Sequence, residues 1–472
     1  MDSILGRRPL GPLALLSLTL LFAAPALAQT QAGAPTLEQL RTDYAVRFLE
    51  PDSHMALARH FRDRGEPLLA FLILEAARRN YFERKNFDAA FKTHFLGEKP
   101  FDNGPAAEVR LLSELSKNPN SFDALHGLAD IYISREDYAK GKEYLLRAIA
   151  LRPDDYAETE ALAQVLGLED KDEEAAKVLA DWALKHPETA DAYAIRISQL
   201  PETDTARAAA LLAEAAARFP QDARFPFALA GARLGARDLK EAERLYVRAA
   251  ELAPGSAHVQ TWVGRFFFKA KEDKRRALPY YLNAYLLDPH AYETEFVESR
   301  IPKISIELAE ARFKELQGKG VALTKIAEDP DPFLAMLALE RMGEAWRPEY
   351  AEPLVRLMAH DDPALRAAAM GVLKEKAGPA FDARLKALLS DSDLRRRGLA
   401  AYIAVNRWKA ASFDAMRAML REEAQLLRYD AISALIMEGG AEGRRVALQH
   451  RPNEKQPRLK EMLDLAAREN PR

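Results

Sequence analysis

Apolar residues recur along most of the chain at the three- and four-residue spacing of helices that bury one face. The stretch 122–156 shows this pattern twice, with a short polar turn between the two predicted helices. The first predicted helix buries Leu125, Leu128, Ala129 and Tyr132. The second buries Gly141, Leu145 and Ala148, and Pro153 follows its end. The small residues allow two helix backbones to approach closely, and the large residues fill the space beside them.

The same pattern recurs along the chain, and most copies end in a proline. These prolines are Pro119, Pro153, Pro187, Pro220, Pro254 and Pro289, separated by 34, 34, 33, 34 and 35 residues. A period of about 34 residues is that of a helix–turn–helix repeat. The further copies are 223–254 and 257–289, weaker ones at 156–187 and 190–220, one near 57–77 without the proline, and a degenerate one at 85–121. In the copy 190–220, the pattern places Ala209, Ala213 and Ala216 at buried positions.

This arrangement of small residues, large residues and proline resembles the tetratricopeptide repeat. The resemblance covers about 51–291, some seven units. It implies a right-handed superhelix whose concave groove is lined by the first helix of each unit.

After Pro289 the period changes to 31 residues. The positions that share this step include Asp331, Asp362 and Asp393; Arg366, Arg397 and Arg428; and Ala338, Ala369, Ala400 and Ala431. Each aspartate is predicted to cap a helix, and the prolines after the first two suit the first helical position. We hypothesise that each repeated arginine contacts the aspartate of the neighbouring repeat.

This second region resembles short HEAT-type repeats, similar to the α-solenoid repeats of bilin lyases. The predicted fold is therefore all-α, a tetratricopeptide solenoid followed by a HEAT-like solenoid. The predicted segments are an N-terminal segment at 29–50, the first solenoid at 51–291, a helical bridge at 292–321, about four HEAT-like repeats at 322–448 and a C-terminal capping helix at 449–472.

Residues 1–28 have the features of an export signal. Arg7 and Arg8 precede the apolar run Leu13–Ala24, and Ala26-Leu27-Ala28 has the small residues of a cleavage site. Cleavage after Ala28 would release a periplasmic or secreted protein, and no other stretch is apolar enough to span a membrane. The chain contains no cysteine, which excludes disulfides and thiolate metal sites.

Charge and motifs narrow the possible chemistry. The chain has 68 basic and 71 acidic residues, so it lacks the overall basic character of a nucleic-acid-binding protein. None of the nine histidines has the spacing of a metal ligand, and we expect no metal and no cofactor. No nucleophile elbow, phosphate loop or dinucleotide fingerprint is present, so we expect no catalytic residues and no enzyme. The acidic runs at 169–174 and near Asp331, Asp362 and Asp393 are interpreted as helix caps.

The predicted groove of the later repeats holds the candidate binding residues. They are Arg224, Phe227, His258, Thr261, Arg265, Phe268 and Lys269. Cations beside aromatic rings suit an extended acidic or carboxylate-ended peptide. The alternative is that the rings pack against the next unit and the cations form an ordinary solvated face. The asparagines of the family's chaperone-tail clamp are replaced here by Gln164, Gly231 and Arg265, so that ligand is not implied.

Three functions remain open on the sequence alone. The first is a periplasmic scaffold that binds other proteins or extended peptides, for example in envelope or secretion complexes. The second is a carbohydrate- or peptidoglycan-associated factor that uses an aromatic patch. This patch consists of Trp262, Phe266, Phe267, Tyr280, Tyr281 and Tyr285, most of which we expect in the core. The third is an enzyme related to the bilin lyases, for which the shared repeat is the only argument.

Overall fold

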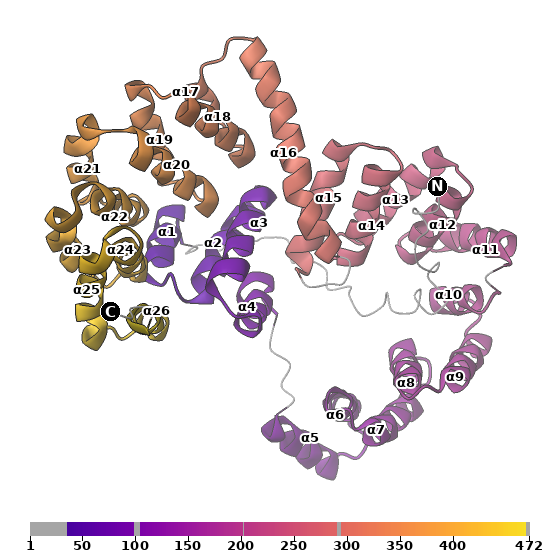
Figure 1. The fold of residues 1–472 in the computed structure, drawn as a ribbon. Coiled ribbons are helices and arrows are strands. Elements are labelled where there is room, and N and C mark those ends of the chain that lie inside the picture. Colours follow the sequence, from indigo (N-terminus) through magenta and orange to yellow (C-terminus); the bar gives the residue numbers. More distant parts are fainter. Residues whose placement is uncertain (1–34, 99–103, 202, 290–293, 469–472) are drawn as a thin grey trace. The chain divides into compact units, whose positions relative to one another are not determined.

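The computed structural model describes residues 35–98, 104–201, 203–289 and 294–468, with the backbone alone for residues 294–298. These residues form helices and turns without a strand (Figure 1), which confirms the all-α fold. They make two compact units. The first contains the described residues of Pro100–Glu272, and the second contains those of Leu27–Lys99 and Asp273–Arg472. The predicted export signal lies outside the described residues.

The first unit consists of α5 followed by helices that alternate between the first and second positions of a repeat. The first helices are α6 (Phe122–Ser134), α8 (Tyr156–Leu168), α10 (Ala190–Ser198), α12 (Arg224–Gly235) and α14 (Ala257–Lys269). The second helices are α7 (Tyr138–Leu151), α9 (Asp172–Lys185), α11 (Thr205–Arg218) and α13 (Leu239–Leu252), and α5 spans Pro105–Lys117. Helices that follow one another in the chain pack together.

The small residues lie where two helices approach most closely, as the sequence predicts. A Cβ atom at Gly141 in α7 would lie 2.7 Å from Cγ1 of Ile133 in α6, so no larger residue fits there without a shift. Neighbouring repeats are also joined through the closing prolines. Arg147 and Arg248 each donate to the carbonyl oxygen of the proline before their own repeat, Pro119 and Pro220 respectively, at 3.3 Å.

Two predictions for this unit are wrong in detail. In α11 the buried residues are Leu212 and Ala215, whereas Ala213 is exposed, so the predicted register is off by one residue. Alanines occupy so much of α11 that apolar contrast does not define its buried face. The run 169–174 gives no side-chain cap to α9 within the described structure; instead, Glu169 forms ion pairs with Lys142 and Lys171.

Ala249 tests the helix packing of the first unit. It is fully buried in α13, so Ala249→Trp is expected to overpack the contact and to lower the free energy of unfolding by about 1–3 kcal/mol. Urea denaturation measures this change. Ala217→Trp places the same ring on the exposed side of α11 and serves as the control. Equal stabilities of the two variants would show that α13 does not pack as described.

The second unit begins with the N-terminal helices and continues from α15 to the C-terminus. The N-terminal helices are α1 (Leu37–Val46), α2 (Pro51–Asp63), α3 (Pro67–Ala76) and α4 (Arg84–Ala90), with π-helical turns at Ala77–Tyr81 and Phe91–Leu96. Then follow α15 (Lys274–Leu287), α16 (Thr294–Gly318), α17 (Leu323–Ile326), α18 (Pro332–Glu344), α19 (Ala351–Leu357), α20 (Pro363–Lys376) and α21 (Asp382–Leu388). The last helices are α22 (Leu394–Trp408), α23 (Phe413–Met419), α24 (Gln425–Glu438), α25 (Gly440–His450) and α26 (Pro457–Arg468).

The 31-residue period corresponds to a repeated helix start. The side chains of Asp331, Asp362 and Asp393 accept hydrogen bonds from backbone N–H groups in the first turns of α18, α20 and α22. This confirms the predicted caps. The fourth position of the series is Ala424, and α24 has no side-chain cap within the described residues.

The hypothesis for the repeated arginines is wrong. Arg366 donates to the backbone carbonyl oxygens of His360 and Asp361 at 2.7 and 3.2 Å, in the turn before its own helix. Arg428 makes the equivalent bonds to Glu422 and Glu423. Arg366 and Arg428 therefore bind the turn before their own helix, whereas Arg397 forms an ion pair with Glu422, in the turn before the next repeat. In the described structure, none of the three pairs with the capping position of the neighbouring repeat.

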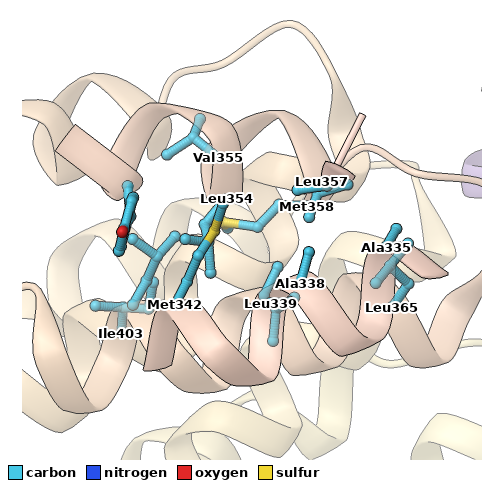
Figure 2. Packing of buried hydrophobic residues seen from close by; sticks show 14 of the residues in the cluster. Ala335, Ala338, Leu339, Met342, Leu354, Val355, Leu357, Met358, Leu365 and Ile403 are labelled. Carbon is cyan, nitrogen blue, oxygen red and sulfur yellow. The ribbon is translucent and has the colours of Figure 1, made fainter. Parts of the chain in front are cut away.

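A continuous apolar core extends from α16 to α22. Figure 2 shows Ala338, Leu339 and Met342 of α18 packed against Leu354 and Val355 of α19, and all five side chains are almost completely buried. The short second helices α19 and α21 are sufficient here because each contributes two or three large side chains to this core.

The N-terminal helices pack onto this array (Figure 1). Arg41 of α1 forms an ion pair with Asp361, and the hydroxyl group of Tyr44 accepts a hydrogen bond from Arg366 at 3.2 Å. Further along, the backbone N–H of Leu49 donates to the Gln425 side chain at 2.8 Å. The second compact unit therefore combines N-terminal residues with residues of the predicted segment 322–448, because helices far apart in sequence pack together. Where each predicted repeat segment begins and ends stays a prediction.

Candidate functional site

The predicted binding residues all lie on α12 and α14, two first helices of the first unit. Three of them, His258, Arg265 and Lys269, share one face of α14 with Trp262 of the predicted aromatic patch, because the four positions follow at intervals of four, three and four residues. We call these four residues the α14 row.

Arg224 lies inside the unit instead of in an open groove. Its guanidinium group forms ion pairs with Asp191 at 2.8 Å and with Asp222 at 2.6 Å, and its side chain is 9% exposed. Burial alone would lower the pKa of Arg224, but the two carboxylates outweigh it and raise the pKa. The residue therefore joins α12 to the neighbouring α10, and its charge is already neutralised.

Phe227 is a buried apolar residue next to the α14 row. Its buried ring packs edge-on against Tyr246 at 5.9 Å and against His258 at 5.3 Å between ring centroids. Burial raises the pKa of Tyr246 to about 12, which is consistent with an apolar surrounding. Packing between adjacent repeats, the alternative weighed for Phe227, is what the structure shows.

The α14 row itself combines rings and cations. The rings of His258 and Trp262 lie 6.2 Å apart, and the guanidinium carbon of Arg265 lies 5.0 Å from the Trp262 ring centroid. This cation–π contact holds the guanidinium group against the indole ring. Lys269 is exposed at the end of the helix.

The remaining two predicted residues differ in exposure. Phe268 is half-buried. Thr261 is buried, and its hydroxyl group has no hydrogen-bond partner within the described residues. The structure thus brings His258 and Arg265 together on one face and places Arg224, Phe227 and Thr261 in the interior.

The aromatic patch divides between the two units. On α14, Phe266 and Phe267 are buried and Trp262 is half-buried; on α15, Tyr281 and Tyr285 are buried. Buried rings cannot stack on a sugar, so these four rings do not favour carbohydrate binding.

A second charged group on the first helices was not predicted. His126 of α6 contacts the buried carboxylate of Glu158 in α8 at 2.7 Å and lies 3.4 Å from Asp130. The hydrogen bond to Glu158 raises the pKa of His126 to about 9, so the imidazole is charged at neutral pH. The sequence signal is a glutamate at an otherwise buried position of α8.

No cluster of three metal-ligating side chains occurs in the part of the chain that the structure describes. Nor does any described helix combine the length and apolar character that a membrane span requires.

Comparison with known proteins identifies two repeat segments. Tetratricopeptide-repeat family profiles match residues 122–155 and 200–265. No curated protein matched the sequence. Among solved structures, that of Pseudomonas aeruginosa pilF has 17% identity and a TM-score of 0.30, with 54% of this chain and 98% of that chain covered. The P58(IPK) TPR domain has 15% identity and a TM-score of 0.24, with 89% and 97% covered. Human IFIT1 has 14% identity and a TM-score of 0.31, with 89% and 99% covered.

The two matched segments coincide with the helix pair α6–α7 and with the stretch from α11 to most of α14. Sequence profile and helix pairing therefore agree over these residues. Together they support a protein that contains tetratricopeptide repeats, a fold that typically serves as a non-catalytic interaction scaffold.

Proposed function

We propose that this protein is an exported, non-catalytic adaptor that binds other proteins or extended peptides along the first helices of its tetratricopeptide repeats. The observation that carries the proposal is the α14 row, in which Arg265 stacks on Trp262 and Lys269 is exposed at the end of the same face. Two cations on one helix face attract a carboxylate or an acidic segment. Export rests on the sequence of residues 1–28.

The proposed role is the assembly of envelope or secretion complexes. A stacked array offers many small contacts to a long partner without a catalytic centre. The 31-residue array of 322–448, which we propose to be HEAT-like, would supply a second surface of the same kind.

Charge reversal on the α14 row tests this function. Arg265→Glu together with Lys269→Glu is expected to remove partners that bind through acidic groups, because the carboxylates that replace the two cations repel those groups. Crosslinking in the native host followed by mass spectrometry measures the set of partners.

The matched control is Lys177→Glu together with Lys240→Glu. It makes the same change in charge at exposed positions of the second helices α9 and α13. If the site variant and the control retain the same partners as the unchanged protein, the α14 row is not the binding site.

A further inference from the structure

A surface cavity of about 660 Å³ lies at the C-terminal end of the second unit. It is bordered by the end of α23, the start of α24 and the end of α25. Its volume falls within the range of about 300–1,000 Å³ of small-molecule sites. Only two apolar side chains, Leu420 and Val446, contribute to its lining, so the cavity suits a polar ligand.

A buried ion pair forms one wall of the cavity. Arg428 donates to Glu454 at 3.1 Å, and Nε2 of His450 lies 3.1 Å from the same carboxylate. Burial alone would raise the pKa of Glu454, but hydrogen bonds from the Gln456 N–H and from Arg428 outweigh it and lower the pKa. Glu454 therefore stays ionised and balances the charge of Arg428.

Two other charged side chains at the cavity, Arg417 and Glu422, also have an oppositely charged partner. Arg417 forms an ion pair with Asp414 at 2.7 Å, and Glu422 forms one with Arg397. These pairs do not contribute net charge to a ligand.

Arg421 and Lys455 are the cations that remain. Both line the cavity and are exposed, and neither side chain makes a hydrogen bond or an ion pair within the described residues. The exposed carboxylate of Glu423 lies on the same lining. Two unpaired positive charges against one negative charge leave an excess of about one positive charge, which one carboxylate neutralises. A phosphate dianion carries more negative charge than this excess.

We propose that this cavity binds a carboxylate-bearing polar ligand, with Arg421 and Lys455 holding the carboxylate. The guanidinium group of Arg421 offers a planar pair of donors, and the ammonium group of Lys455 adds a point charge. The amides of Gln449 and Asn453, which also line the cavity, suit the peptide groups of a chain end. The carboxylate belongs either to a peptide C-terminus or to a free small acid. This site lies in the second unit and does not depend on the α14 row.

Calorimetric titration of the full mature chain tests the site. The probes are the N-acetylated tripeptide Gly-Gly-Ser with a free C-terminus, the same peptide as its C-terminal amide, and acetate. The free acid is expected to bind, with the amide at least tenfold weaker. Arg421→Gln together with Lys455→Gln is expected to weaken the binding of the acid at least tenfold.

The control is Lys376→Gln together with Lys386→Gln, which removes two exposed cations elsewhere in the second unit. It is expected to bind the acid as the unchanged protein does, and circular dichroism checks that every variant is folded. Acetate binding as tightly as the tripeptide, with the same loss in the site variant, would identify a small acid as the ligand. The proposal is overturned if no carboxylate probe binds at 10 mM, or if the site variant binds like the control.

Discussion

Asp361→Ala is expected to destabilise the second unit by about 3–5 kcal/mol, the usual cost of removing one member of a buried ion pair. Asp361 is 7% exposed and lies 2.8 Å from Nη1 of Arg395, which is itself 6% exposed. It also binds Arg41 of α1 with both carboxylate oxygens. Removing it leaves one buried guanidinium group with a single remaining carboxylate, Asp393, and frees α1 from its ion pair.

The direction of the Asp361 pKa agrees with this role. Burial alone would raise the pKa, but the hydrogen bond from Arg41 and the charge of Arg395 outweigh it and lower the pKa below its ordinary value. The carboxylate is therefore ionised at neutral pH, and its charge is needed to balance the two arginines.

Hydrogen exchange read by mass spectrometry locates the effect of Asp361→Ala. Peptides from α1 and from α20 to α22 are expected to exchange more than about a hundredfold faster, which corresponds to about 3 kcal/mol. Peptides from α6 to α13 should not change. Asp414→Ala is the control, because Asp414 is 96% exposed and its ion pair with Arg417 is worth little. Equal exchange in the two variants would rule out a structural role for the Asp361 pairs.

Local signals made much of this fold predictable. The prolines and the alternation of small and large residues mark the helix pairs, because packing between adjacent helices depends on residues close in sequence. Asp331, Asp362 and Asp393 were predictable as caps for the same reason. The packing of the N-terminal helices against the C-terminal repeats could not be predicted. The pairing of Arg41 with Asp361 spans 320 residues and produces no periodic pattern in the sequence.

The candidate site was predictable only in outline. Helical spacing places His258, Arg265 and Lys269 on one face of α14, and their role in binding stays a prediction. The burial of Arg224 was not predictable, because it depends on Asp191 in the preceding repeat. Spacing within a helix identifies a face, but the neighbouring helix decides which charges on that face are already paired.

Asp430 gives the second unit a dependence on pH. It is 5% exposed in α24, and a Cβ atom at position 398 would lie only 2.1 Å from its Oδ2 atom, so Gly398 makes the space for its carboxyl group. Burial raises its pKa to about 7, opposed by the charge of Arg366 and a hydrogen bond from Tyr402. Tyr44, Tyr81 and Tyr429 also lie in its electrostatic surroundings.

The sign of the effect follows from this raised pKa. Between pH 3.8 and about 7, the folded chain holds a proton on Asp430 that the unfolded chain has released. The stabilising contribution is complete below pH 3.8 and is lost as the pH rises through about 7. Three pKa units correspond to about 4 kcal/mol.

Asp430→Asn keeps the shape of the protonated carboxyl group and removes its charge. The variant is therefore expected to gain stability over the unchanged protein as the pH rises, by about 2–3 kcal/mol between pH 5 and pH 8. Urea unfolding with pulse proteolysis, read from peptides of α24, measures the difference in unfolding free energy between the two proteins at each pH.

Two histidines also titrate in this range. Burial lowers the pKa values of His54 and His360 to about 4, so both proteins lose the same stability as the pH falls below 6.5 and the effect cancels in the difference. Asp414→Asn at an exposed site should show no such trend. A difference that stays constant from pH 5 to pH 8 would mean that Asp430 titrates at its ordinary value and that the burial described for it is incorrect.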